Sequence, residues 1–541
     1  MNRVLVVGGY GGFGLRLSRR LVADGWQVLV AGRRLAKAQA AARELGGAGG
    51  VRFDRTGDCA AQLADIKPDL VIDAAGPFQG SDYRLPLACI AARVPYIDLA
   101  DARDFVCGIA VLDEAARTAG VPVISGASSV PALSAAVLRE LTRGLDRIAA
   151  IESTISATTK ASSGLAVVRS ALSYAGQPIR VWQAGQWEHQ PGWSLARRER
   201  FAVPGVAPLT RRVALAEVPD LELFPALFPG APATLFRGGS EFSLQMRALA
   251  LLGWVVGKGW LPSAARLAPW LAPLQQATAR LGGDRSAMLV RIKGWAGSKP
   301  VERRWTLIAE QGQGQEIPTL AAQLLARRLR DGRLAPGARH AAGELALADF
   351  EQLFEQLPVA YVAEEDTLEP LYRRILGSRY AALAPELQAL HQPIAESRAV
   401  GEADVTRGSG ILAGLIGLVM RFPPAGAYPL EVRFAPSGGR EKWTRRFGPN
   451  SFSSEMSEGP GGTLTERFGP MRFHFALDVA ADGALAMRLA RWSAFGLPMP
   501  IALAPRITAG EHGADGRFHF DVAVAMPLIG PVVHYRGWLD T

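Results

Sequence analysis

The chain has 541 residues, of which 49% are hydrophobic and 20% charged, so it can bury more than one core and is expected to form two or three domains. Its formal net charge is +10, but only seven of its sixty basic residues are lysine, and no basic stripe is interleaved with aromatic residues. Nucleic-acid binding is therefore not expected. No export signal precedes the first predicted strand, which predicts a cytoplasmic protein. The three cysteines, Cys59, Cys89 and Cys107, match no metal-binding spacing and predict reduced thiols.

A glycine-rich turn follows the first predicted strand. Residues 4–7 are Val-Leu-Val-Val, and Gly9, Gly11 and Gly14 then show the spacing G-x-G-x-x-G before a helix expected over 15–24. In such a turn the first glycine allows the bend, the second lets the backbone approach a pyrophosphate, and the third lets the helix pack on the strand. A second buried strand is expected over 26–31. The complete β-α-β pattern predicts a dinucleotide-binding start rather than an ordinary turn.

Two arginines occupy the position that selects between the nicotinamide dinucleotides. A site that prefers NAD has an acidic residue about twenty residues beyond the last glycine, where it binds the ribose 2′-hydroxyl. This chain has Gly32-Arg33-Arg34 in that region. Two cations favour a 2′-phosphate, so the sequence predicts NADP as the cofactor. The alternative is that Arg33 and Arg34 merely begin a solvated helix.

The first domain continues to alternate strands and helices. Further strands are expected over 51–54, 69–75, 94–99 and 121–126, which gives a doubly wound parallel sheet of about six strands. Asp54 lies at a strand end, where it is placed either to accept from the adenine amino group or to cap the next turn. Ligands of such sheets bind outside the carboxyl ends of the strands, so the loop over 76–79 is expected to face the ribose or nicotinamide.

Hydride transfer needs a proton donor or an electrostatic stabiliser beside the nicotinamide, and the first domain contains no histidine. The candidates at strand ends are Tyr96, Asp98, Asp101 and Ser125, with Lys160 as a more distant one. Each has a structural alternative: a core tyrosine, helix-capping aspartates, a turn serine and a solvated lysine. No G-x-S-x-G elbow supports a serine hydrolase. The acid–base residue is left open.

Several motifs carry a family resemblance. The segments GGYGGFG, AGRR, DAAGPF, VPYIDLAD and VPVISGASSVPALSAAV occur in this order between residues 8 and 137. Together they resemble the saccharopine-dehydrogenase-like oxidoreductases, and the likeness covers roughly the first two thirds of the chain. It implies an α+β domain after Pro131 and a nicotinamide-dependent oxidoreductase, without fixing the substrate.

The same resemblance assigns the cofactor residues. It implies that the glycine turn holds the phosphates, the arginine pair the 2′-phosphate, and the loop after the fourth strand the nicotinamide ribose. With Asp54 as the adenine candidate, the predicted cofactor site is Gly9, Tyr10, Gly11, Gly12, Phe13, Gly14, Arg33, Arg34, Asp54, Ala75, Gly76, Pro77 and Phe78. No metal site is expected.

A middle domain is expected over 130–362, after a first domain over 1–129. Its tryptophans at 254, 260 and 270 suit either a long apolar ligand or helix packing. The most apolar stretches, 248–257 here and 408–420 further on, are too short to span a bilayer. A core helix is the preferred interpretation of each, and an apolar tunnel or a membrane-surface patch is the alternative. The glycine- and arginine-rich segment 332–343 predicts an exposed loop.

The last domain is expected over 363–541. A helix over 371–390 precedes strands with alternating apolar residues, as in Phe473, Phe475 and Leu477, which predicts an antiparallel sheet with one wet face. Segments 443–448, 466–470 and 497–500 resemble a C-terminal domain of unknown function that is often fused to bacterial members of the family. A curved sheet holding an apolar ligand is preferred for this domain over a metal site formed by three histidines, His474, His519 and His534.

The expected fold class is therefore α/β plus α+β: an N-terminal Rossmann-like doubly wound parallel sheet, an α+β middle domain and a β-rich antiparallel C-terminal domain. The predicted function is that of an NADP-dependent oxidoreductase acting on a small molecule of apolar or acyl type. The alternative is a non-catalytic NADP-sensing or lipid-binding protein that retains the nucleotide fold. A lipid-like substrate, peripheral membrane contact and a homo-oligomer are left open as partners.

Overall fold

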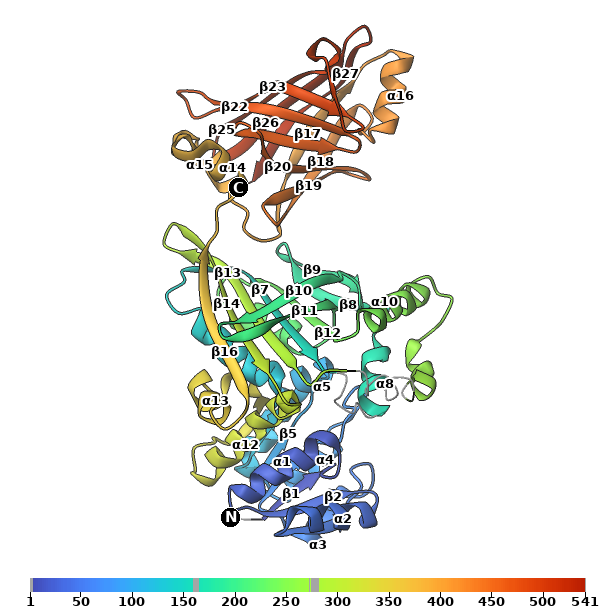
Figure 1. The fold of residues 1–541 in the computed structure, drawn as a ribbon, viewed down its shortest axis with the longest axis vertical. Helices are drawn as coiled ribbons and strands as arrows, with labels where there is room; N and C mark the ends of the chain where they lie inside the picture. Colours follow the sequence, from blue (N-terminus) through green and yellow to red (C-terminus); the bar gives the residue numbers. More distant parts are fainter. Residues whose placement is uncertain (1–2, 159–164, 272, 274–281, 541) are drawn as a thin grey trace. The chain divides into compact units, whose positions relative to one another are not determined.

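The computed structural model describes residues 3–158, 165–271, 273 and 282–540, so the candidate Lys160 lies outside the described residues. The chain forms two compact units (Figure 1). Unit 1 contains residues up to 182, 187–292 and 302–366, and unit 2 contains 183–186, 293–301 and the chain from 367 onward.

The first sheet of unit 1 has seven parallel strands in the order β15-β6-β5-β4-β1-β2-β3. Strand β1 pairs with β2 on one side and β4 on the other, so the strand order reverses at β1, where doubly wound sheets bind ligands. The predicted Rossmann-like sheet is confirmed. Its strands are β1 (Arg3–Val7), β2 (Gln27–Gly32), β3 (Ala48–Arg52), β4 (Leu70–Asp73), β5 (Tyr96–Asp98), β6 (Pro122–Ser125) and β15 (Gly337–His340).

Helices connect these strands and bury both faces of the sheet, which is why β1 and β4 are almost continuously apolar. The connecting helices are α1 (Gly12–Ala23), α2 (Leu35–Leu45), α3 (Cys59–Ile66), α4 (Arg84–Ala91), α5 (Arg103–Gly108) and α6 (Asp113–Ala119). A later helix, α12 (Ile317–Arg330), packs against α1 and is tied to it by ion pairs from Arg16 and Arg20 to Glu316, at 2.8 Å and 2.7 Å.

The seventh strand corrects the prediction of about six strands and of an exposed loop over 332–343. Strand β15 pairs with β6 in parallel, and both Gly337 and Ala338 are buried. Strand β15 has only four residues, and its Gly337 has φ +120°, so the sequence shows no strand periodicity there. The segment becomes a strand because it pairs with the free edge of β6.

The second sheet of unit 1 is mixed, in the order β10-β11-β12-β7-β13-β14-β16, and confirms the α+β middle part. Its strands are β7 (Arg147–Ala157), β10 (Arg197–Val203), β11 (Val206–Leu215), β12 (Ala233–Ser240), β13 (Ser286–Ala296), β14 (Lys299–Ala309) and β16 (Val359–Thr367). A small separate sheet is formed by β8 (Pro178–Gln183) and β9 (Gln186–Pro191). The accompanying helices are α7 (Ser134–Leu141), α8 (Leu165–Ser173), α9 (Asp220–Leu227), α10 (Ser243–Gly257) and α13 (Leu347–Phe354).

The three tryptophans that were considered for an apolar ligand are not packed into a core. Trp254, Trp260 and Trp270 are 51%, 71% and 81% exposed, and the rings of Trp254 and Trp260 contact each other edge to face. Helix packing is therefore the wrong interpretation for these three residues.

Unit 2 contains a closed antiparallel barrel of ten strands, which confirms the β-rich antiparallel prediction. The order runs β22-β21-β20-β19-β18-β17-β27-β26-β25-β23, and the pairing of β22 with β23 closes the ring. The strands are β17 (Ser397–Arg407), β18 (Gly426–Ser437), β19 (Arg440–Phe447), β20 (Asn450–Gly459), β21 (Thr463–Phe468), β22 (Met471–Val479), β23 (Leu485–Ala494), β25 (Arg506–Ala514), β26 (Arg517–Met526) and β27 (Gly530–Asp540), with a short outer strand β24 (Leu497–Met499) on β23.

The predicted alternation places apolar side chains inside this barrel. Phe473, Phe475 and Leu477 are buried in the same core as Phe434 and Phe518 of other strands. Because successive side chains of a strand point to opposite faces, closing the sheet turns one apolar face into an interior.

The long helix predicted over 371–390 is wrong. The chain forms α14 (Leu371–Leu376), a 3-10 turn over Gly377–Ala382 and α15 (Pro385–Leu390). Gly377 has φ +57°, which ends α14, and Pro385 has no backbone N–H, so it begins a new helix instead of continuing one.

The three histidines considered for a metal site have separate neighbours. His474 hydrogen-bonds with Thr465 at 2.9 Å, His534 with Asp521 at 2.8 Å, and His519 stacks on His512.

The apolar stretch 408–420 forms α16 (Ile411–Val419), in which only Ala413 and Gly417 are buried. The core-helix interpretation of this stretch is therefore wrong. No helix in the described part of the chain has both the length and the apolar character needed to cross a membrane.

Candidate functional site

The glycine turn lies at the point where the strand order of the first sheet reverses. Gly8 has φ +76°, and a Cβ there would lie 2.8 Å from the backbone of Ala75. A Cβ on Gly9 would lie 2.8 Å from the carbonyl oxygen of Val6, and one on Gly14 would overlap the carbonyl oxygen of Gly8. Gly12, in contrast, faces open space. The close packing of β1, α1 and the loop after β4 thus requires glycine at positions 8, 9 and 14.

The first turn of α1 has backbone donors available for an anion. Gly11 is the N-cap residue, so no side chain caps the helix, and no acidic residue occupies its first turn. The first N–H groups of a helix lack intrahelical partners, and the helix dipole favours negative charge there. This is the geometry that binds a pyrophosphate.

The arginine pair lies next to the glycine turn. Arg33 and Arg34 follow directly after β2 and are exposed, and neither guanidinium forms an ion pair with another described residue. The ring of Tyr10 covers Gly32, where a Cβ would overlap it, and the Tyr10 hydroxyl accepts from the backbone N–H of Arg34 at 3.4 Å. Tyr10 therefore joins the two predicted phosphate-binding segments.

Asp54 lies close to the arginine pair and caps its own turn. Its Oδ1 accepts from the hydroxyl and the backbone N–H of Thr56, at 2.8 Å and 3.0 Å. These bonds, together with the charges of Arg33 and Arg52, hold the pKa of Asp54 below its usual value. Its contact with an adenine stays a prediction.

The loop after β4 is held by residues that the sequence did not single out. Asp73 ends β4 and is buried; its Oδ2 lies 3.0 Å from Nη1 of Arg55, and its Oδ1 accepts from the backbone N–H of Ala75 at 2.9 Å. Arg55 also donates to the carbonyl oxygen of Pro77 at 3.1 Å and to Ser81 Oγ at 2.7 Å. Burial raises the pKa of Asp73, and Arg55 opposes that rise.

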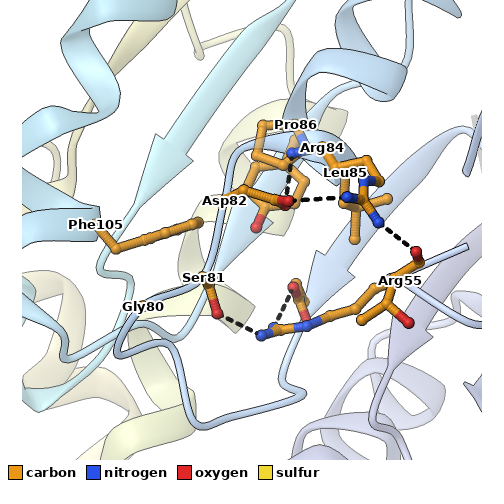
Figure 2. A pocket seen from close by; sticks show the side chains of 11 residues that line it. Arg55, Gly80, Ser81, Asp82, Arg84, Leu85, Pro86 and Phe105 are labelled. Atoms are coloured by element: carbon orange, nitrogen blue, oxygen red, sulfur yellow. Dashed lines mark hydrogen bonds and ion pairs between the residues drawn. The ribbon is translucent and has the colours of Figure 1, made fainter.

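Arg55, Asp73 and Ser81 line a cavity of about 200 Å³ at the carboxyl edge of the sheet. Figure 2 shows the guanidinium of Arg55 directed at Ser81, with Phe105 also lining the cavity. The guanidinium of Arg55 lies 4.9 Å from the ring centre of Phe78. The sequence signal that was available is Asp73 itself, a carboxylate at the end of an otherwise apolar strand.

The catalytic candidates differ in their exposure to solvent. Tyr96 and Asp98 alternate along β5 and are fully buried, and the Tyr96 hydroxyl has no hydrogen-bond partner among the described residues. Burial raises the pKa of Tyr96 well above its usual value. Asp101, just beyond the strand, is exposed as a residue, yet partial desolvation of its carboxyl group raises the pKa of Asp101, and a hydrogen bond with Gln79 opposes that rise.

Asp98 has a distinctive environment. Its Oδ1 accepts from the backbone N–H groups of Ala100 and Gly126, at 2.9 Å and 2.8 Å, and from Ser125 Oγ at 3.0 Å. Its Oδ2 is buried without a hydrogen-bond partner in the described part of the chain, and burial raises the pKa of Asp98 to about 7. The carboxyl group therefore changes its charge near neutrality and holds together the loops that follow β5 and β6.

Comparisons with known proteins bear on both units. Residues 2–67 match the model of the short chain dehydrogenase family, and residues 383–539 match the model of a domain of unknown function, DUF4166. None of the curated proteins matches the sequence.

A solved structure shares the fold of the larger part of the chain. Saccharopine dehydrogenase (L-Glu forming) from Saccharomyces cerevisiae is 16% identical, with a TM-score of 0.50 over 68% of this chain and 100% of the other. Amine dehydrogenase from Mycobacterium smegmatis is 12% identical, with a TM-score of 0.37 over 63% of this chain and 95% of the other. The NADP complex of RhlG from Pseudomonas aeruginosa is 16% identical, with a TM-score of 0.20 over 23% and 69%. At 16% identity the likeness to saccharopine dehydrogenase shows the fold alone, and the other two likenesses are too weak to show even that.

Proposed function

Because the chain has the saccharopine-dehydrogenase-like fold fused to a domain of unknown function, we propose that it is an NADP-dependent oxidoreductase. One observation carries the proposal: the uncapped first turn of α1 lies at the reversal of strand order, and Tyr10 ties it to two exposed arginines without ion-pair partners in the described chain.

In this proposal the protein binds the cofactor through three segments. The N–H groups of the first turn of α1 bind the pyrophosphate, and Arg33 and Arg34 bind the 2′-phosphate, since the guanidinium fork matches phosphate geometry. The loop from Ala75 to Phe78, fixed by Arg55, contacts the nicotinamide ribose. When bound, NADPH supplies the hydride.

Of the four described catalytic candidates, Tyr96, Asp98 and Ser125 are buried and Asp101 is exposed, so Asp101 is placed to contact a substrate. Asp98 acts as a positioning residue in this arrangement, because its hydrogen bonds fix the backbone at Ala100 and Gly126. The substrate expected from the sequence, a small molecule of apolar or acyl type, and a cytoplasmic location remain part of this proposal.

The cofactor assignment is tested by fluorescence titration with NADPH and NADH. We expect the parent protein to bind NADPH more tightly, and the double variant Arg33→Ala/Arg34→Ala to lose that preference through weaker NADPH binding. Hydrogen bonds to charged groups contribute about 1.5–3 kcal/mol, which corresponds to a loss of roughly tenfold to a hundredfold. Arg43→Ala is the matched control, because Arg43 is an exposed arginine in the last turn of α2. Equal affinities of the parent for both dinucleotides would overturn the 2′-phosphate assignment.

The alternative of a non-catalytic NADP-sensing protein gives a different result. An oxidoreductase consumes NADPH in the presence of a substrate from a panel of long-chain carbonyl and enoyl compounds, and Asp101→Asn lowers that rate without weakening NADPH binding. NADPH binding with no consumption across the panel would favour the sensor.

A further inference from the structure

One end of the barrel in unit 2 is apolar on its outer surface. The antiparallel register places five connections at this end: α16 after β17, the turn 448–449 after β19, the turn 469–470 after β21, the loop 495–505 after β23, and the turn 527–529 after β26. Figure 1 shows α16 beside the end of β27. We call this region the α16 end.

Exposed large apolar side chains of unit 2 gather at the α16 end. Of the eleven such residues described in this unit, only Val400 lies elsewhere. Ile411 is 92% exposed and Leu418 is 75% exposed, although both belong to a regular helix. A concentration of exposed apolar side chains at one end of a domain is typical of an interaction site. Its members are Ile411, Leu412, Leu415, Leu418, Val419, Phe495, Leu497, Ile501, Leu503 and Leu528.

A cavity of about 380 Å³ lies beneath α16. Leu415, Val419 and Met420 line it from the helix side, and Phe473 and Val524 line it from the barrel wall. Its volume falls within the range of about 300–1,000 Å³ that is usual for small-molecule sites. The lining is almost wholly apolar, so the site suits a hydrocarbon chain.

One charged side chain, Glu466, contributes to the cavity lining, and it lies 3.7 Å from Arg445. A carboxylate ligand buried next to Glu466 would face like charge, so the buried end of the ligand must be uncharged. The polar end of a long-chain ligand would therefore stay at the mouth of this cavity, in contact with solvent.

Glu466 lies in the cavity lining, but the connections that form the α16 end carry only positive charge. The segments 408–426, 468–472, 492–508 and 525–531 contain no aspartate or glutamate, whereas they contain Arg421, Arg472 and Arg506. Apolar side chains ringed by cations match an anionic lipid surface. A second copy of this chain docked through the same patch would bring these arginines together, because a two-fold interface places like residues opposite each other.

We propose that the α16 end lies on an anionic lipid surface and that the barrel takes one acyl chain from it into the cavity beneath α16. The proposal concerns unit 2 alone and does not depend on the dinucleotide assignment. It gives the domain of unknown function a lipid-chain site.

The surface contact is tested with the full chain and vesicles of phosphatidylcholine, with and without phosphatidylglycerol, by co-sedimentation. We expect binding to the anionic vesicles, weakened by salt. Leu412→Glu/Leu418→Glu should reduce it at least tenfold, since each buried leucine contributes about 1.5–3 kcal/mol. Val400→Glu is the control, an exposed apolar residue away from the α16 end, and should bind like the parent. Failure of the parent to bind, or equal loss in both variants, would overturn the surface contact.

The cavity is tested with the neutral dye N-phenyl-1-naphthylamine and its displacement by oleyl alcohol. We expect the parent to bind the dye and release it to oleyl alcohol, and Val524→Phe, which fills the cavity, to bind the dye at least tenfold more weakly. Val522→Phe replaces it if the first variant does not fold by circular dichroism. A parent that binds no dye, or folded variants that bind it normally, would overturn the chain site. NADPH affinity should be the same in all these proteins, which separates this outcome from that of the proposed function.

Discussion

Asp73 and Arg55 form an ion pair, Oδ2 to Nη1 at 3.0 Å, that joins the end of β4 to the loop after β3. The same guanidinium holds Pro77 and Ser81, so the loop expected to face the nicotinamide ribose is positioned by a residue outside the glycine motif.

Replacing Arg55 should therefore affect both folding and cofactor binding. Arg55→Ala leaves the Asp73 carboxylate buried without its cation, and we expect the free energy of unfolding to fall by about 3 kcal/mol in urea denaturation. Adding Asp73→Asn to Arg55→Ala should recover part of this loss, because the buried charge is gone. Arg19→Ala, which breaks an exposed pair with Glu44, should cost less than about 1 kcal/mol. Equal losses in Arg55→Ala and Arg19→Ala would contradict the role of the pair.

Two glycines of the phosphate turn should respond differently to alanine. At Gly14 the new Cβ overlaps the carbonyl oxygen of Gly8, so Gly14→Ala should lower the free energy of unfolding by about 1–3 kcal/mol. At Gly12 nothing lies within 4 Å, so Gly12→Ala should keep its stability and instead weaken NADPH binding, since the backbone there is expected to approach the pyrophosphate. Urea denaturation and fluorescence titration measure the two effects. A stable Gly14→Ala variant would show that the turn can shift freely.

Asp98 should make stability depend on pH below neutrality. Burial raises its pKa to about 7, so between about pH 4 and 7 the folded protein keeps a proton that the unfolded chain has lost. The free energy of unfolding should fall as pH rises through this range, by about 4 kcal/mol in total, and level off above it.

The variant Asp98→Asn isolates this contribution. Asparagine does not ionise, so the difference in unfolding free energy between parent and variant should change with pH over the same range. Asp220, whose pKa burial also raises to about 7, is present in both proteins and cancels in the difference. Parallel stability curves would show that Asp98 titrates normally.

A buried carboxylate also organises the middle sheet. Glu152 on β7 pairs with Arg197, Arg237 and Arg291, which hold its pKa below the usual value although burial alone would raise it. Its stabilising effect is therefore present at neutral pH and lost as pH falls through the pKa of the folded state. Glu152→Gln removes the carboxylate that pairs with the buried Arg237, whereas Arg197 and Arg291 keep Glu199, and should cost about 3 kcal/mol at pH 7 in urea denaturation. Glu140→Gln, in an exposed pair with Arg143, is the control and should change little.

Local patterns were sufficient for the first β-α-β unit and for the barrel strands. Gly9, Gly11 and Gly14 are close to each other in sequence, and the packing that requires glycine there involves the adjacent strand and helix. The alternation of Phe473, Phe475 and Leu477 is a property of one strand, so it can be recognised without its neighbours.

Features that depend on distant partners were not predictable in this way. Arg55 holds a loop about twenty residues further on, and nothing in its own surroundings marks it. Segment 408–420 is apolar on all sides, so periodicity cannot tell a buried helix from an exposed one. Strand β15 has four residues, which are too few to show a hydrophobic alternation.

Because β15 pairs with β6, the first sheet can be completed only after residue 340 has been synthesised. While the chain between residues 126 and 336 is being synthesised, the outer edge of β6 has no neighbour, and an unpaired edge is a template for association with other chains. The contacts of Arg16 and Arg20 with Glu316 form equally late. The nucleotide-binding part is thus completed by segments that follow it by some two hundred residues, and contacts so distant in sequence slow folding.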